Sequence, residues 1–195
     1  MAPRSGPGST GCTPREQPTP ARWGLALVIT VVLPLLNSCV APPPSGAGKS
    51  GYCTSEDHNA VTVIVDYGDL GPDPTIGCAY NLHEGATGLD ALNALGITVL
   101  EPSNSPHFIC RLNGYPTVDQ VIPIPGQDSY TEVCVNTPPA AAYWTYWIEN
   151  AEGQWAYSIK GSSTNPVVFG SAQGYSFAHN QLPVASPPLI EPRNS

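Results

Sequence analysis

The sequence predicts an α+β fold in which strands outnumber helices. Runs rich in β-branched and aromatic residues recur through the middle of the chain, and one segment has the spacing of an amphipathic helix. The same region holds four cysteines, an even number that favours disulfides. We therefore expect a single domain of mostly antiparallel strands that pack on one helix and are braced by disulfides.

The first two predicted strands form a hairpin. Residues 61–66 read Val-Thr-Val-Ile-Val-Asp, and residues 75–80 read Thr-Ile-Gly-Cys-Ala-Tyr. The residues between them, 67–74, are rich in Gly, Pro and Asp, which is typical of a turn.

A helix is predicted over residues 87–96. Thr87 can cap its N-terminus, and an aspartate three residues later completes a capping box. Leu89, Leu92 and Leu95 recur at three-residue spacing and define one apolar face. Gly96 is typical of the position just beyond a helix C-terminus.

Short strands are predicted in the rest of the domain. An Asn-Gly turn at 113–114 should end the second of them. The Pro-rich residues 115–140 should form a long loop that Cys134 pins down. The predicted strands are residues 97–100, 107–113, 141–149, 154–159 and 174–178.

Proline content divides the chain into parts. Residues 1–51 hold 9 prolines and residues 183–195 hold 4, whereas the 131 residues between them hold 10. We assign residues 1–38 to a signal peptide and 39–52 to a Pro/Gly/Ser-rich tether. Residues 53–182 then form the domain, and 183–195 form a disordered tail.

The N-terminal segment resembles the signal peptide of bacterial lipoproteins. An arginine-containing stretch precedes the apolar residues 23–36, which are fewer than the about 20 that a bilayer-spanning helix needs. Leu36-Asn-Ser-Cys39 follows and resembles a lipobox, in which cleavage leaves Cys39 to carry a diacylglycerol. We expect a lipid anchor at Cys39 on the outer face of a bacterial cytoplasmic membrane. An ordinary secretory signal and an uncleaved anchor helix are the alternatives.

The cysteines beyond Cys39 should form two disulfides, as is usual in exported domains. Three pairings are possible. Cys53–Cys78 with Cys110–Cys134 is preferred because nearby cysteines close the smaller loops. A zinc site is the competing interpretation, but the chain has no C-x-x-C motif and no histidine at ligand spacing from a cysteine.

Charge and motifs exclude several functions. Cleavage before Cys39 would leave 4 basic and 14 acidic residues, a formal charge of −10. So few basic residues disfavour nucleic-acid binding. The chain has no phosphate-binding loop and no G-x-S-x-G nucleophile motif. We therefore expect a protein that is not an enzyme and has neither a cofactor nor a metal site.

Four segments, in order, resemble a known family. They are Val61–Asp66, Thr87-Gly-Leu-Asp-Ala-Leu, Phe108-Ile-Cys-Arg-Leu-Asn-Gly and Tyr143-Trp-Thr-Tyr-Trp. Together they resemble the transcobalamin C-terminal-like domains of bacterial surface proteins, which implies a β-grasp-like sheet that wraps one helix. In vertebrate B12 carriers this domain forms one side of a clamp on the corrinoid, and a large helical domain forms the other. One amphipathic helix cannot supply that second half, so enclosed cobalamin binding is not expected.

Aromatic residues are concentrated between positions 143 and 157. Strand alternation directs Tyr143 and Trp147 to one face of the sheet and Trp144 and Tyr146 to the other. Trp155 and Tyr157 share a face on the next strand. Aromatic rings on both faces suggest that some of them stack on a ligand, although cross-strand packing is the simpler role. The residues that we expect to bind a ligand are Tyr143, Trp144, Tyr146, Trp147 and Trp155.

We expect the domain to capture a small ligand without chemical conversion. The resemblance implies a corrinoid, delivered to a membrane transporter. The alternative is an envelope protein–protein interaction or structural module with no small ligand. A flat apolar patch would favour that module, whereas an aromatic pocket with a few polar groups would favour the ligand.

Overall fold

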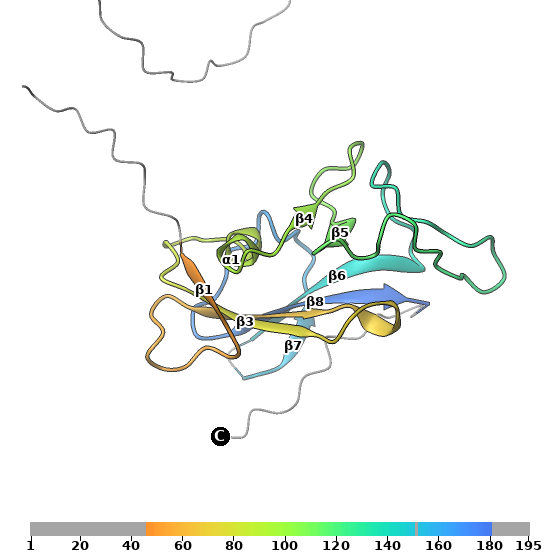
Figure 1. Cartoon of the computed structure of the whole chain (residues 1–195). Helices are drawn as coiled ribbons and strands as arrows, with labels where there is room; N and C mark the ends of the chain where they lie inside the picture. The colour runs from red at the N-terminus through yellow and green to blue at the C-terminus, as the bar shows by residue number, and fades with distance from the viewer. Residues whose placement is uncertain (1–45, 151, 181–195) are drawn as a thin grey trace, which may run out of the picture. The chain divides into compact units, whose positions relative to one another are not determined.

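The computed structural model describes residues 46–150 and 152–180 (Figure 1). Within these ranges the α+β prediction is confirmed: a six-stranded sheet is accompanied by one α-helix, a two-stranded pair and two disulfides. The helices are η1 (Gly68–Leu70, a 3-10 turn) and α1 (Gly88–Ala94). The strands are β1 (Ala47–Ser50), β2 (Val61–Asp66), β3 (Thr75–Tyr80), β4 (Val99–Leu100), β5 (Arg111–Leu112), β6 (Ala142–Glu149), β7 (Trp155–Tyr157) and β8 (Ala172–His179).

The large sheet has the strand order β1-β3-β2-β8-β6-β7. The central pair β2–β8 is parallel, and the other pairs in the sheet are antiparallel. In Figure 1, α1 and the β4–β5 pair lie on the same side of this sheet. We call that side the inner face and the opposite side the outer face.

The helix forms as the sequence predicts. The Thr87 hydroxyl oxygen accepts a hydrogen bond from the Asp90 amide at 3.3 Å, and the Asp90 carboxylate accepts one from the Thr87 amide at 2.8 Å. This capping box satisfies two amides that the first helical turn leaves unpaired. Leu92 is fully buried in the core, and Gly96 follows the C-cap with a φ of 69°. A left-handed φ at that position favours glycine.

One strand lies in residues that we assigned to the tether. Residues 47–50 form β1, which pairs antiparallel with β3 at the edge of the sheet. A Cβ atom on Gly48 would lie 2.5 Å from the carbonyl oxygen of Ala94, so only glycine lets α1 approach β1 this closely. The sheet therefore begins before residue 53.

The region between α1 and β6 is less regular than predicted. The expected strands at 97–100 and 107–113 shrink to the two-residue strands β4 and β5. His107 has a φ of 81°, which is incompatible with a continuous strand. The Asn113-Gly114 turn is present, and Leu112 and Tyr115 exchange two backbone hydrogen bonds of 2.9 and 3.0 Å across it.

The inner face carries the main core. Valine side chains of β2 meet α1 and the inward aromatic side chains of β6 and β8. The last strand is longer than predicted, at residues 172–179, because it pairs on both sides, with β2 and with β6.

Candidate functional site

The sheet divides the five predicted ligand-binding residues between its two faces. Trp144 and Tyr146 point to the inner face and belong to the main core. Tyr143, Trp147 and Trp155 lie together on the outer face, where Trp147 packs against Ala178. Strand alternation predicted this division of β6.

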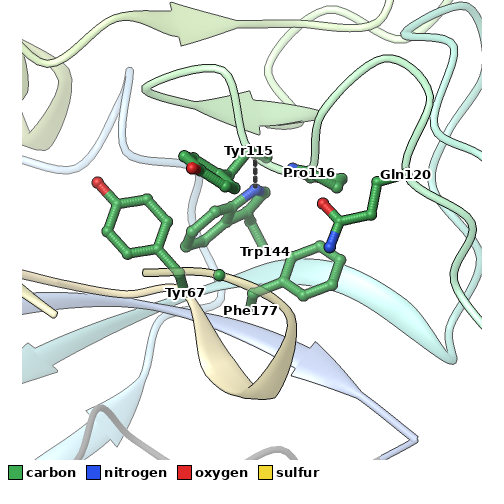
Figure 2. Close-up of a pocket in the computed structure, with 7 residues that line it drawn as sticks. Tyr67, Tyr115, Pro116, Gln120, Trp144 and Phe177 are labelled. Atoms are coloured by element: carbon green, nitrogen blue, oxygen red, sulfur yellow. Dashed lines mark hydrogen bonds between the residues drawn. The ribbon is translucent and has the colours of Figure 1, made fainter. Parts of the chain in front are cut away.

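The inner ring of Trp144 is enclosed by other aromatic side chains (Figure 2). Tyr67 and Phe177 contact it edge to face, with centroid distances of 5.8 and 5.4 Å. Its indole N–H donates to the carbonyl oxygen of Tyr115 at 3.3 Å. The cavity beside it measures about 10 Å³, which is no larger than one water molecule requires. A ring held in this way serves the core and has no open face for a ligand.

The inner residue Tyr146 belongs to a buried polar cluster. Its hydroxyl donates to the Gln173 side-chain oxygen at 2.9 Å, and the Gln173 amide nitrogen donates to the Gly88 carbonyl oxygen at 3.3 Å. Burial raises the pKa of Tyr146 to about 12. The residue also lines a cavity of about 120 Å³ next to Val167. That volume is below the range typical of small-molecule sites.

The outer face carries four aromatic side chains from β6 and β7. Trp147 is 6 % exposed and meets Tyr157 edge to face, with ring centroids 5.4 Å apart and planes at 90°. Tyr143 and Trp155 are half-buried beside Trp147, and Tyr157 is 49 % exposed. Burial raises the pKa of Tyr157, and the neighbouring Tyr143 phenol raises it further. We call Tyr143, Trp147, Trp155 and Tyr157 the outer aromatic cluster.

Two polar residues of β6 adjoin the outer aromatic cluster. Thr145 is buried; its hydroxyl donates to the Ser176 carbonyl oxygen and accepts from the Trp147 indole, both at 2.8 Å. Glu149 is opposite Trp155 in the β6–β7 register, and its carboxylate accepts from the Ala172 amide at 2.9 Å. The carboxylate is thereby held at the start of β8, where Glu149 also lines the inner-face cavity beside Tyr146 and Val167.

Our set of predicted ligand residues omitted Tyr157 and Glu149. The signal for Tyr157 was present, because a residue two positions after Trp155 on a strand must share its face. The same rule places Glu149 two positions after Trp147 on β6, whereas its pairing with Trp155 depends on the hairpin register.

The disulfides occupy the cysteines that might otherwise bind metal. Cys53–Cys78 and Cys110–Cys134 are both formed, which confirms the preferred pairing. A carboxylate lies near each of them, from Asp57 and Glu132. Oxidised sulfurs are not thiolate ligands, so these two groups are poor candidates for a metal site.

An open groove of about 250 Å³ lies between β1, β3 and the end of α1. The residues that line it are Gly48, Lys49 and Ser50 of β1, Thr75, Ile76 and Gly77 of β3, and Leu95 and Ile97. No aromatic ring lines it, so it does not match the chemistry that the sequence predicted for the site.

Comparison with protein-family models, curated proteins and solved structures finds no match to the chain. Cys39 and the apolar residues 23–36 lie outside the described residues, as do the predicted tail and the first half of the tether, residues 39–45. Within residues 46–150 and 152–180, no helix is long and apolar enough to cross a membrane.

Proposed function

We propose that this protein is a bacterial surface lipoprotein that captures a small ligand on its outer aromatic cluster. The observation that carries the proposal is that four aromatic side chains share the sheet face opposite the helix. A face needed only to close the core would not require this much aromatic surface on its solvent side. Partly exposed Tyr and Trp rings are well suited to stack on a flat ligand.

The order of the strands is consistent with the family resemblance. The hairpin β2–β3, then α1, then β6–β8, with β2 and β8 parallel at the centre, supports a β-grasp-like sheet that wraps one helix. The resemblance to transcobalamin C-terminal-like domains in turn makes a corrinoid the first ligand to test. Delivery to a membrane transporter would be the biological role.

We propose the cellular location of the protein from its N-terminal signal segment and its disulfides. Disulfides persist in oxidising compartments, and both are present here. Lipidation at Cys39 would place the domain on the extracytoplasmic face of the membrane, where a captured ligand can meet a transporter. We propose no catalytic step and no cofactor.

The test is a titration of the purified, oxidised protein with cobalamin and with cobinamide. Tryptophan fluorescence and corrinoid absorbance are followed together. Saturable quenching with a shifted corrinoid spectrum is expected. Tyr157→Ala should weaken ligand binding without unfolding the protein, because this ring is exposed and contributes little to core packing. The matched control is Phe108→Ala, since Phe108 is 54 % exposed on a loop outside the outer aromatic cluster.

Different outcomes of this titration test the identity of the ligand and the position of its binding surface. Equal weakening by Tyr157→Ala and Phe108→Ala would overturn the assignment to the outer aromatic cluster. An absence of saturable signal well above micromolar concentration would remove corrinoids as the ligand.

One observation favours the alternative, a protein–protein interaction module. The segment from β4 to β6 exposes many large apolar side chains: Leu100, Phe108, Val118, Val121, Val133 and Val135. Exposed apolar surface on loops is typical of contacts with other proteins. Crosslinking on intact cells from position 108, compared with position 157, would identify a partner of this segment.

A further inference from the structure

We propose that Cys110–Cys134 is a redox-active disulfide that exchanges with an external dithiol, whereas Cys53–Cys78 only braces the fold. The outer aromatic cluster takes no part in this exchange, so the inference does not rest on the proposed function. Three features support it: the hydrogen-bond partners of the two sulfur atoms, the exposure of one cysteine, and the contacts that hold the loop between the cysteines.

The sulfur atoms of Cys110 and Cys134 lie beside the partners that a reduced pair requires. The Arg111 guanidinium donates from Nη1 to the Cys134 sulfur at 3.3 Å, and a thiolate at that position would accept a charge-assisted bond. The Cys110 sulfur lies 3.3 Å from the Leu100 carbonyl oxygen, to which a thiol can donate. A cation beside a cysteine favours its reactive thiolate form. The reduced pair would therefore consist of a thiolate at Cys134 and a thiol at Cys110.

The Glu132 carboxylate opposes the effect of Arg111. It lies within 4.8 Å of both sulfur atoms. Its two oxygens accept hydrogen bonds of 2.5 Å, one from the Cys134 amide and the other from the Tyr130 hydroxyl. These two donors offset part of the carboxylate charge, whereas the guanidinium donates directly to a sulfur. We therefore expect the influence of Arg111 on the thiolate to be the larger one.

The other disulfide, Cys53–Cys78, provides a matched comparison within the same chain. Each disulfide joins a buried cysteine to a partly exposed one, and the sequence separations are 25 and 24 residues. Each also has a carboxylate within 4.8 Å of its sulfur atoms, which is that of Asp57 at Cys53–Cys78. The cation beside Asp57 is Lys49, which pairs with the carboxylate at 2.6 Å. The two sites therefore differ in that a cation donates to a sulfur atom at Cys110–Cys134.

Contacts other than the disulfide hold the loop that Cys110 and Cys134 close. Arg111 donates from Nε to the Pro116 carbonyl oxygen at 2.6 Å and from Nη2 to the carbonyl oxygen two residues before Cys134. Both cysteines also have backbone hydrogen bonds, of 2.9 and 3.0 Å, to the segment 100–103. Reduction should therefore leave the loop folded and the two sulfur atoms close enough to re-form their bond.

The exchange takes place in two steps. A thiolate of the external dithiol attacks the sulfur of Cys134, which is the partly exposed cysteine, and the Cys110 sulfur leaves and takes up a proton. The second thiolate of the dithiol then attacks its partner sulfur in the mixed disulfide and releases the Cys134 thiolate beside Arg111. The dithiol is oxidised once per protein molecule, and two electrons pass to the cysteine pair. Of the two protons that the dithiol loses, one goes to Cys110 and the other to water.

The test is a titration of the oxidised full-length protein with dithiothreitol. Free thiols are alkylated at each concentration, and peptide mass spectrometry measures the reduced fraction of each disulfide. We expect Cys110–Cys134 to be half reduced at a concentration at least about tenfold lower than Cys53–Cys78 requires, which is the effect of one hydrogen bond to a charged group. The circular dichroism spectrum should stay native between the two midpoints. Equal midpoints, earlier reduction of Cys53–Cys78, or loss of the native spectrum with the first reduction would overturn the proposal.

Two variants separate a redox role of Arg111 from a structural one. Arg111→Met removes the charge and should raise the dithiothreitol midpoint of Cys110–Cys134 about tenfold, whereas mere loss of packing would make the disulfide easier to reduce. Glu132→Gln removes the opposing charge and should lower this midpoint. Lys49→Met, beside the other disulfide, is the matched control and should leave it unchanged.

The direction of these shifts decides the role of Arg111. A midpoint that is unchanged or lowered in Arg111→Met, or raised in Glu132→Gln, would overturn the proposal. If Arg111→Met does not fold, Glu132→Gln and the comparison of the two disulfides in the unaltered protein decide it.

Single-cysteine variants identify the sulfur that reacts. Cys110→Ser leaves Cys134 as a free cysteine beside Arg111, and Cys134→Ser leaves Cys110, which is 1 % exposed. Oxidised glutathione should form a mixed disulfide with Cys134 in the first variant at least about tenfold faster than with Cys110 in the second. Equal rates, or a faster reaction at Cys110, would overturn the assignment of Cys134 as the reacting cysteine.

Discussion

At the scale of single residues, two buried tyrosines on neighbouring strands show how context sets the role of a hydroxyl group. Tyr146 and Tyr175 stack with their ring centroids 5.0 Å apart on the inner face. The Tyr146 hydroxyl bonds to Gln173, whereas that of Tyr175 lies beside the Ser162 side chain and makes no hydrogen bond of good geometry.

The two hydroxyls should therefore respond oppositely to removal. Tyr146→Phe leaves the buried Gln173 oxygen unpaired and should lower the free energy of unfolding by about 1–2 kcal/mol. Tyr175→Phe removes an unpaired group and should be neutral or slightly stabilising. Urea unfolding of both variants at neutral pH measures the difference, and an equal loss of stability would contradict this reading.

Tyr146 also predicts a dependence of stability on high pH. Its pKa in the folded protein is about 12, raised from 10.0 chiefly by burial. The unfolded chain therefore loses this proton first, so the stabilisation is complete below about pH 10 and is lost as the pH rises to about 12. The free energy of unfolding, measured across this range, should fall less steeply in Tyr146→Phe. An unchanged slope would show that other groups govern the alkaline transition.

At the scale of elements, the strands with a strong residue pattern could be predicted from the sequence. Strands that form only because a neighbouring strand or helix stabilises them could not. The apolar run of β2 and the aromatic alternation of β6 indicated both strand and face. The sequence of β1, Ala-Gly-Lys-Ser, carries no such pattern. That strand exists because β3 offers an unpaired edge and because Gly48 and Gly77 leave room for Leu95 of the helix cap. In the outer site, alternation places Tyr157 with Trp155 and Glu149 with Trp147, whereas the pairing of Glu149 with Trp155 comes from the hairpin register.

The close approach at β1 can be tested with Gly48→Ala. The added methyl group would meet backbone atoms of the helix end at 2.5 and 2.8 Å, which cannot move as a side-chain end can. We expect a loss of about 1–3 kcal/mol in the free energy of unfolding. Ser50→Ala, on the same strand, should have little effect. A Gly48→Ala variant as stable as Ser50→Ala would mean that β1 does not pack against α1.

The two disulfides close loops of nearly equal length, with sequence separations of 25 and 24 residues. Chain entropy alone therefore predicts that removing either one costs about 3 kcal/mol. Replacing both cysteines of each pair by alanine and measuring thermal unfolding tests this. The loop that Cys110–Cys134 closes has a second internal link. The buried Arg111 guanidinium donates to the Pro116 carbonyl oxygen at 2.6 Å. A markedly smaller cost at Cys110–Cys134 would show that Arg111 holds the loop without the disulfide.

At the scale of the whole molecule, the presence of β1 shortens the segment that would link the domain to a membrane. With β1 beginning at Ala47, only residues 39–46 separate the proposed lipid from the sheet. Eight residues span about 28 Å when fully extended. The acidic chain, with a formal charge of −10 after cleavage, would not be drawn to anionic lipid by charge, so attachment must depend on the lipid itself.

That dependence gives a prediction about the full-length protein expressed in a bacterium. Cys39→Ser should release the protein from the membrane fraction, because the proposed acyl chains would supply the attachment, at about 0.8 kcal/mol for each buried methylene. Cys12→Ser is the matched control, since Cys12 lies in the segment that cleavage would remove, and it should leave the protein in the membrane fraction. Mass spectrometry of the purified protein should find the acyl groups at a new N-terminus formed by Cys39. If Cys39→Ser stays in the membrane fraction as firmly as Cys12→Ser, the apolar residues 23–36 act as an uncleaved anchor.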